Sequence, residues 1–264
     1  GMNLLEEFFA SHGVRSYGAI GYKDEFVMRD KSLERRFPHL RVSLCAFAVP
    51  YYVNDGGRRN ISRYAVPRDY HIFFDGFFSE MRDFFAQRMP EGHIEGFADT
   101  SPFNERALAL ACGVGSLGDN GLIINPEYGS YVFLGSIIAD FNIEMKEKSA
   151  VGTRRCTHCG ACRRACPSPD RCLSMITQTK GELSDDDKAL IRRCGCAWGC
   201  DICQDVCPAN ANLPNTPEKF FKESRIPYLT VQTVENMSDE AFAERAYAWK
   251  GRKCIIRNLE ILGL

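Results

Sequence analysis

The stretch that decides the fold is CTHCGACRRACP, residues 156–167. Its cysteines follow the pattern C-x2-C-x2-C-x3-C-P, which is the spacing of bacterial [4Fe–4S] ligand runs. Three thiolates on a tight loop can hold three irons of one cube, and Gly160 gives that loop backbone freedom. The fourth thiolate, Cys166, lies on the helical turn that Pro167 ends, so we expect it to point away and ligate a second cluster.

A second block, CDICQDVCP at residues 200–208, repeats the pattern with one cysteine missing. We expect Cys172, which lies between the blocks, to supply the missing ligand, with Cys194 and Cys196 as alternatives just upstream. In two-cluster modules the last cysteine of each block ligates the other block's cluster. This rule gives Cys156, Cys159, Cys162 and Cys207 for the first cluster, and Cys166, Cys172, Cys200 and Cys203 for the second.

A zinc site is the alternative interpretation of the cysteines. Zinc motifs usually pair two separated Cys-x2-Cys knuckles and have no need of the x3-Cys-Pro ending, so the iron–sulfur interpretation is preferred. His158 lies inside the first ligand loop, and we interpret it as a surface residue or a neighbour of the ligands. Three cysteines stand alone in apolar surroundings and are predicted to be buried structural thiols: Cys45, Cys112 and Cys254.

Arginines surround the cysteine blocks. They could offset the negative charge of the clusters or contact an anionic substrate, while simple solvation of a charged surface is the alternative. The residues concerned are Arg154, Arg155, Arg163, Arg164, Arg192 and Arg193.

The composition is that of an ordinary globular protein. The chain has 264 residues, a net charge of −1 and thirteen cysteines. Balanced charge argues against binding nucleic acid mainly through bulk positive charge.

We interpret Gly1-Met2 as an expression remnant ahead of the natural start. No secretory signal is visible and no apolar run approaches the roughly 18 residues of a membrane span, so we expect a cytoplasmic protein without a membrane partner. Clustered cysteines in that compartment indicate metal ligation.

The residues before the cysteine blocks predict an α/β or α+β domain. Asp69 is a plausible N-cap for a long helix with an aromatic stripe, and Ser101-Pro102 predicts the start of another helix that runs to Ala111. Glycines between residues 113 and 121 predict a flexible loop. Short helices are expected at 3–10 and 30–37, and strands at 41–49, 122–125 and 131–138, the last two as a hairpin-like pair.

The domain organisation follows from these patterns. The composition changes at residues 146–149, before the first cysteine block, and Pro/Asn-rich residues follow the second block. The tail from about Ser238 has the pattern of amphipathic helix. The predicted division is 2–148 for the first domain, 149–215 for the cysteine module and 216–264 for a helical tail.

Several segments carry a resemblance to the epoxyqueuosine reductase family. The resemblance extends over nearly the whole chain, including Cys172-Leu-Ser-Met-Ile-Thr and the segment from Gly251-Arg252 to Leu259. In the first domain it rests on Arg63-Tyr64-Ala65 with Asp69-Tyr70-His71, on Asp99-Thr100-Ser101-Pro102 with Glu105-Arg106-Ala107-Leu108-Ala109, and on Asn125-Pro126-Glu127-Tyr128-Gly129-Ser130 with Phe133-Leu134-Gly135.

The resemblance implies both a fold and a reaction. The implied fold is α+β, with an N-terminal α/β domain of cobalamin-binding type, a ferredoxin-like module with two [4Fe–4S] clusters, and a helical tail. The implied protein is an oxidoreductase of queuosine biosynthesis in which an external low-potential donor and the clusters feed electrons to cobalamin. The reduced cofactor then removes the epoxide oxygen of epoxyqueuosine in tRNA. Such cofactors carry chemistry that side chains cannot.

The resemblance also assigns a role to Asp99, as the proton donor of the D-[ST]-x-P segment. Desolvation beside an apolar macrocycle would raise the pKa of a carboxyl group, which suits a general acid. From the residues alone, a capping role ahead of Ser101 is the alternative. His71 lies in a segment similar to the cobalt-binding D-x-H-x-x-G motif, but Phe74 stands where that motif has glycine. We therefore interpret His71 as structural or substrate-side.

Two departures from the family pattern favour alternatives. The family usually has G-W-x-G-K after the glycine-rich loop, whereas residues 115–119 are GSLGD. Full-length members continue into helical repeats that help to hold tRNA, and this chain ends at Leu264, so we expect a short form with weaker tRNA binding. The alternatives are a cobalamin-dependent reductase of another small substrate and a two-cluster electron-transfer protein without cobalamin.

Overall fold

The computed structural model describes residues 4–144 and 152–264. They form two compact units, Gly1–Pro50 with Phe73–Cys159, and Tyr51–Ile72 with Gly160–Leu264. The composition change at residues 146–149 and the Gly1-Met2 pair lie outside the described residues. The division at 148 and 215 stays a prediction.

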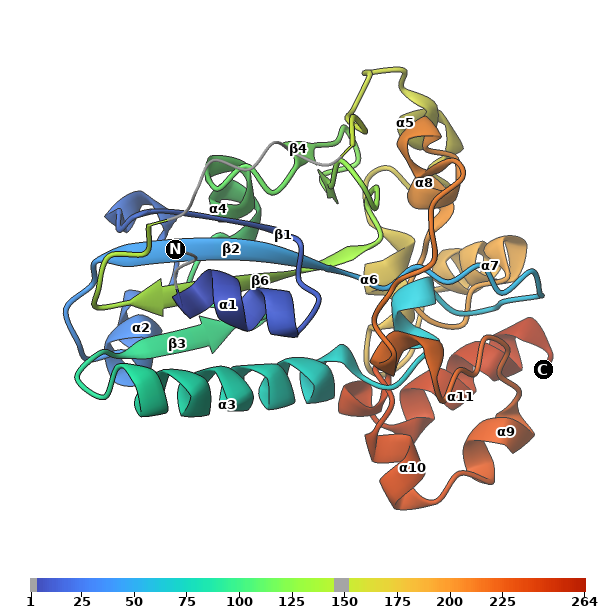
Figure 1. Ribbon diagram of the computed structural model, residues 1–264. Helices are drawn as coiled ribbons and strands as arrows, with labels where there is room; N and C mark the ends of the chain where they lie inside the picture. Colours follow the sequence, from blue (N-terminus) through green and yellow to red (C-terminus); the bar gives the residue numbers. More distant parts are fainter. Residues whose placement is uncertain (1–3, 145–151) are drawn as a thin grey trace. The chain divides into compact units, whose positions relative to one another are not determined.

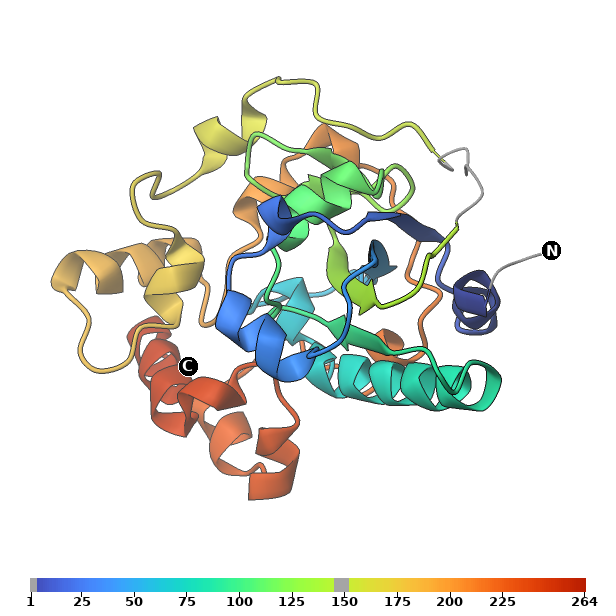
Figure 2. The ribbon, with the colours of Figure 1, turned by 90° about the vertical axis from the view of Figure 1, so that its left-hand side faces the viewer.

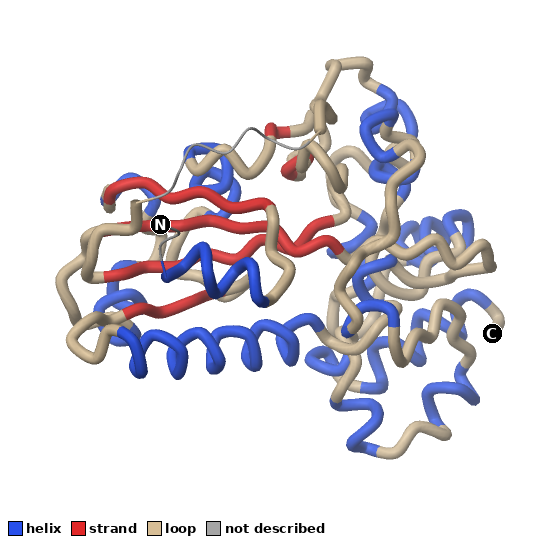
Figure 3. Tube along the Cα trace, in the orientation of Figure 1, coloured by secondary structure: helices blue, strands red, loops and turns tan. Residues whose placement is uncertain are grey.

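A four-stranded antiparallel sheet with strand order β1-β2-β6-β3 forms the centre of the first unit (Figure 1, Figure 3). Every residue of β2 is buried, as expected for an apolar central strand. The strand predicted at 41–49 is therefore confirmed, whereas β1 and β3 escaped prediction. The bounds are β1 (Ser16–Gly21), β2 (Ser43–Pro50), β3 (Ile94–Phe97) and β6 (Val132–Ala139).

Helices cover both faces of this sheet. On one face the Phe47 ring lies 5.1 Å from Phe9 of α1 and 5.2 Å from Phe77 of α3. On the other face Leu44 and its alternate neighbours pack with α2 and α4, because side chains alternate along a strand. Figure 2 shows α4 across the strands from α3. The bounds are α1 (Leu4–Ser11), α2 (Asp30–Arg36), α3 (Tyr70–Arg88) and α4 (Glu105–Ala111).

The aromatic stripe of α3 is core packing, as its periodicity predicts. Phe74, Phe77, Phe78, Met81 and Phe85 are buried. The predicted N-cap is also confirmed, because the Asp69 carboxylate accepts a hydrogen bond of 3.0 Å from the His71 N–H.

The hairpin predicted from residues 122–138 is wrong. β5 (Ile123–Ile124) pairs with β4 (Ser116–Leu117), while β6 pairs with β2 and β3. The segment between β5 and β6 does turn, because the Asn125 side chain accepts bonds from the N–H groups of Glu127 and Tyr128. Burial of the long β6 between two other strands decides its pairing, and a short-range turn signal does not reveal that.

The start predicted for α4 is also wrong. The helix begins at Glu105, and Asn104 caps it by accepting from the Ala107 N–H at 3.2 Å. Pro102 instead offers its carbonyl to the N–H groups of Met28 and Arg29, and the segment before Asn104 has a bend at Pro102 and an isolated bridge from Phe103 to Val27.

Short helices around a buried aromatic core form the second unit. Trp198 and Tyr247 are fully buried, with ring centroids 6.2 Å apart. The predicted helical tail is present as α10 and α11. The bounds are α5 (Ala161–Ala165), α6 (Leu173–Thr177), α7 (Asp185–Cys194), α8 (Ile202–Asp205), α9 (Val231–Glu235), α10 (Asp239–Ala243) and α11 (Arg252–Leu262).

None of the helices in the described residues is both long enough and apolar enough to cross a membrane.

Candidate active site

Asp99 lies in a strained turn just after β3. Its φ is 59°, in the left-handed region, and the Thr100 N–H bonds to the Ala98 carbonyl at 2.6 Å across it. Asp99 is exposed to solvent. A non-glycine residue in this conformation costs energy, although aspartate tolerates it better than most, and such residues cluster at functional sites. Asp99 lies six positions before α4, so the capping alternative does not describe its place.

Glu105 supports the Asp99 turn. Its carboxylate accepts a hydrogen bond from the backbone N–H of Asp99. Burial, and to a smaller extent the nearby charge of Asp99, raise the pKa of Glu105 to about 8, although that hydrogen bond opposes the change. Among the described residues, the Oε1 atom of Glu105 has no hydrogen-bond partner. The E-R segment therefore supports the Asp99 turn, a role that the sequence alone did not indicate.

A pair of buried serines ties the same loop to the sheet. Ser101 Oγ lies 2.9 Å from Ser136 Oγ on β6, and it also accepts from the Phe103 N–H at 3.1 Å. Ser136 in turn donates to the Phe97 carbonyl at the end of β3. The loop that carries Asp99 is thus fixed on both sides of the turn.

Asp119, the acid that departs from the family pattern, binds His158. Its Oδ1 lies 2.8 Å from His158 Nδ1, and the His158 N–H points to the Cys156 sulfur at 3.4 Å. These three side chains could hold a metal ion by their spacing. Because Cys156 is a predicted cluster ligand, Asp119 and His158 are better described as its polar neighbours, as predicted for His158.

The glycine-rich loop borders a pocket of about 230 Å³. Gly113 has a φ of 68°, in agreement with the backbone freedom that the sequence predicts. The pocket also carries two arginines that the sequence marked as possible anion contacts. Its lining consists of Gly113, Gly115, Ser116, Pro126, Gly152, Thr153, Arg154 and Arg155.

None of the thirteen cysteines, all of which lie in the described residues, forms a disulfide. Cys156 and Cys159 belong to the first unit, and the other six predicted ligands belong to the second. In the second unit α5 and α8 pack together, and each is followed by a Cys-Pro pair. Gly160, with a φ of 71°, directly precedes α5 as its N-cap residue. The thiol donors are compatible with iron–sulfur binding.

The structure also locates the two alternatives to Cys172. Cys172 is exposed at the start of α6. Cys196 donates a hydrogen bond to Cys200, which lowers the pKa of Cys200 and, with burial, raises that of Cys196. Burial raises the pKa of Cys194, and its electrostatic neighbours include Cys200 and Cys166. All three cysteines therefore stay in consideration for the fourth position.

Asp201, between two predicted ligands, anchors the Arg63-Tyr64-Ala65 segment. Its buried carboxylate accepts from the Ser62 hydroxyl at 2.6 Å and from the Arg63 N–H at 2.7 Å, and Arg59 lies 3.3 Å away. Burial raises the pKa of Asp201, although these partners oppose the change. Two motifs that are far apart in sequence thus meet within the second unit, and sequence inspection missed their contact.

The predicted structural thiols are buried in two of three cases. Cys45 and Cys254 are buried, whereas Cys112 is partly exposed. Burial raises the pKa of Cys112 to about 12, so it too is unsuited to act as a thiolate. His71 bonds to Asp69 at 2.8 Å, which fits a structural role.

Known structures share this fold. The structure of epoxyqueuosine reductase from Bacillus subtilis, described with its catalytic aspartate loop swung out of the active site, aligns with a TM-score of 0.77 at 24% identity. An epoxyqueuosine reductase with an epoxyqueuosine-modified tRNA-Tyr stem loop aligns with a TM-score of 0.76 at 24% identity. Each alignment covers 98% of this chain and 79% of the other. The fold class is therefore that of the epoxyqueuosine reductase structures.

Sequence relatives identify the family. The epoxyqueuosine reductase of Synechocystis is 30% identical over 76% of this chain and 75% of its own length. That of Staphylococcus aureus is 29% identical over 93% of this chain and 70% of its own length. The chain spans 58% of the relative from Listeria monocytogenes, which is 30% identical. No protein-family profile matches. The chain belongs to the epoxyqueuosine reductase family.

Proposed function

We propose that this protein is an iron–sulfur, cobalamin-dependent reductase that removes the epoxide oxygen of epoxyqueuosine in tRNA. The observation that carries the proposal is the 30% identity to an epoxyqueuosine reductase across three quarters of both chains. The fold of a relative described with a modified tRNA stem loop supports tRNA as the substrate. The protein would act in the cytoplasm and take electrons from an external low-potential donor.

We assign two [4Fe–4S] clusters to the cysteine blocks. The support is the ligand spacing, the absence of disulfides among the thirteen cysteines, and the packing of α5 against α8. The assigned sets are Cys156, Cys159, Cys162 and Cys207 for one cluster, and Cys166, Cys172, Cys200 and Cys203 for the other.

Bound clusters and cobalamin would supply the low-potential electrons and the reactive metal centre that side chains cannot provide. Asp99 is assigned the proton donated to the departing oxygen, because its exposed position lets it reach a ligand. Glu105 accepts the Asp99 N–H and so keeps the strained turn in place. Arg154 and Arg155 line the pocket at the glycine-rich loop, which suits a phosphate, a group that both cobalamin and tRNA carry.

The test is an anaerobic turnover assay with reconstituted protein. Reduced protein is incubated with cobalamin and epoxyqueuosine-containing tRNA, and the digested nucleosides are measured by mass spectrometry. We expect conversion to queuosine, and a loss of about 100-fold or more in rate for Asp99→Asn, since general acids contribute this much. Asp83→Asn is the matched control, because Asp83 is an exposed acid on α3.

The outcomes separate the alternatives. No loss of the epoxide oxygen from tRNA would refute the proposed substrate. Conversion of the free nucleoside but not of the tRNA would favour a reductase of small substrates. If cobalamin added to the cluster-loaded protein shows no spectral change and no stoichiometric binding, the protein is an electron carrier of another class.

A further inference from the structure

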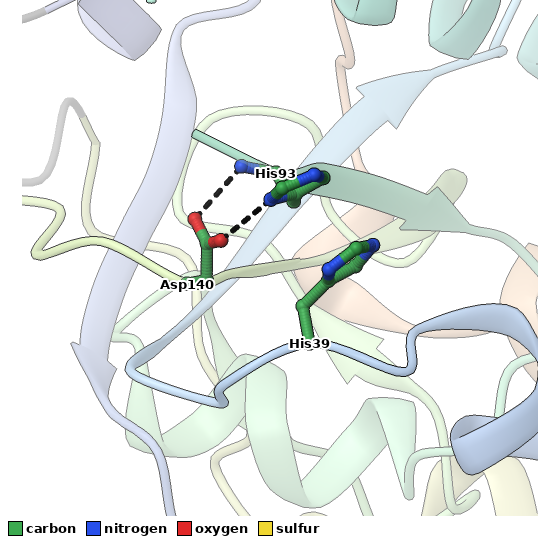
Figure 4. Close-up of side chains that lie close together, drawn as sticks. All are labelled: His39, His93 and Asp140. Carbon is green, nitrogen blue, oxygen red and sulfur yellow. Dashed lines mark hydrogen bonds and ion pairs between the residues drawn. The ribbon is translucent and has the colours of Figure 1, made fainter. Parts of the chain in front are cut away.

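Three side chains of the types that bind metal ions lie together at one end of the sheet. In sequence they are distant from all predicted cluster cysteines. His39 comes from the loop between α2 and β2, His93 directly precedes β3, and Asp140 directly follows β6 (Figure 4). Their ligand atoms all lie within 4.8 Å of one another. Asp99 follows the opposite end of β3, so this group is distinct from the candidate active site.

The carboxylate is oriented by His93. The Asp140 Oδ1 accepts from the His93 N–H at 2.7 Å, and Oδ2 lies 2.7 Å from His93 Nδ1. Both carboxylate oxygens of Asp140 therefore face His93, and a carboxylate is an oxygen ligand for divalent metal ions.

The two imidazoles are stacked, with centroids 3.5 Å apart and ring planes 13° from parallel. An imidazole binds a metal ion through a ring nitrogen that carries no proton. In the described part of the chain, the His39 ring contacts Phe37 and His93 and makes no hydrogen bond. Its nitrogen lone pair is thus available.

The spacing suits a small first-row ion. Nitrogen and oxygen ligands lie about 2.0–2.2 Å from zinc, which places tetrahedral ligand atoms about 3.3 Å apart. Both histidines are exposed, so ring rotation can close the remaining gap and leave a fourth position for water. Two imidazoles and one carboxylate favour zinc, nickel or copper over magnesium or calcium.

We propose that His39, His93 and Asp140 bind one divalent transition-metal ion of the zinc class. The ion cross-links three segments that are remote in sequence and so stabilises this end of the β2-β6-β3 sheet. Because it binds only the folded chain, it adds stability in proportion to its occupancy. Its position at the far end of β3 from Asp99 makes it a structural site.

The test uses protein whose clusters have been assembled anaerobically, so that the ligand cysteines are occupied. Cobalt(II) is titrated first, because nitrogen and oxygen ligands give weak visible bands whereas thiolates give intense near-ultraviolet bands. Zinc affinity then follows from competition with cobalt. The variants are His39→Ala, His93→Ala and Asp140→Asn. The control is His12→Ala, which removes another histidine with a carboxylate partner, Glu80 at 2.9 Å.

We expect one equivalent of cobalt with a nitrogen–oxygen spectrum and a higher melting temperature in zinc. Loss of either histidine should weaken metal binding by more than about 10–100-fold, which is the loss typical when a residue that contacts only a metal ligand is removed. His12→Ala should bind as the parent does. The proposal would be overturned if the His39 and His93 variants bound the metal as tightly as the parent protein, if the spectrum were purely that of thiolate ligands, or if no binding occurred below about 1 mM. Circular dichroism of each variant shows whether it is folded.

Discussion

Replacing Glu105 with glutamine should change how the first unit responds to pH. Burial and the charge of Asp99 raise the pKa of Glu105 to about 8. In the unfolded chain the same carboxyl group titrates near its ordinary value of 4.5. Between these values the folded protein holds a proton that the unfolded chain has released.

The sign follows from proton linkage. Because the folded pKa is raised, folding stability is highest below the unfolded pKa and falls as pH rises toward the folded one. The difference between about 8 and 4.5 corresponds to about 5 kcal/mol, at about 1.36 kcal/mol per pH unit. Partial solvent contact of Glu105 reduces this, so we expect about 2–3 kcal/mol. Glutamine stays neutral and removes the slope.

The measurement is hydrogen exchange of peptides from β2 and β6, compared between Glu105→Gln and the parent at each pH. Both tryptophans lie in the second unit, so their fluorescence would not report on this core. The variant should gain protection relative to the parent between pH 5 and pH 9, with about equal protection near pH 4. Glu34→Gln, at an exposed position on α2, should show no such trend.

A constant difference between variant and parent at every pH would refute this reasoning, since it would show that the pKa of Glu105 is the same in the folded and the unfolded chain. Asp99→Asn offers a second check. Removal of the Asp99 charge should lower the Glu105 pKa and move the loss of stability to lower pH. If the pH range of the stability loss does not change, the carboxyl groups of Asp99 and Glu105 are not electrostatically coupled.

Other predictions follow from packing and buried charge. Gly135→Ala would place a Cβ 2.3 Å from the Phe47 ring, so we expect a loss of about 1–3 kcal/mol in hydrogen-exchange stability of β6. Gly21→Ala, with open space around it, should be close to neutral, and equal losses would contradict the packing argument. Asp201→Ala would leave four hydrogen-bonding groups without their buried acceptor and should cost the second unit about 3–5 kcal/mol in urea unfolding followed by tryptophan fluorescence. A change below 1 kcal/mol would show that these groups find other partners.

The parts of the fold that local sequence determines were predictable. β2 is a continuous apolar run bounded by proline, and α3 repeats its aromatic residues at helical spacing. β1 contains two glycines and β3 is four residues long, so neither carries a strong strand pattern. The pairing of β6 depends on burial between two distant strands. A turn signal at Asn125 predicted the turn correctly but could not identify the partner strand.

The residues of the candidate site likewise differ in how well local sequence predicts them. The predicted cluster ligands are dense in sequence, so their spacing alone indicates iron–sulfur chemistry. The support of Asp99 by Glu105 depends on a left-handed residue, and aspartate at such a position is not identifiable from its neighbours. The contact of Asp201 with Ser62 joins residues 139 positions apart. No local pattern predicts such a pair, although both belong to segments that the family resemblance had marked.

The departure at Asp119 gains a local explanation from these contacts. A cation is usual at this position in the family, and its replacement by an acid argued for another substrate. In the structure the Asp119 carboxylate is engaged by His158, within the ligand loop of the same unit. The acid therefore has a partner inside the protein and is not committed to contact a ligand. The neighbouring pocket is lined by Arg154 and Arg155, so the cationic groups that we propose to bind a phosphate do not include residue 119. The contact with His158 therefore gives the acid at this position a role within the first unit.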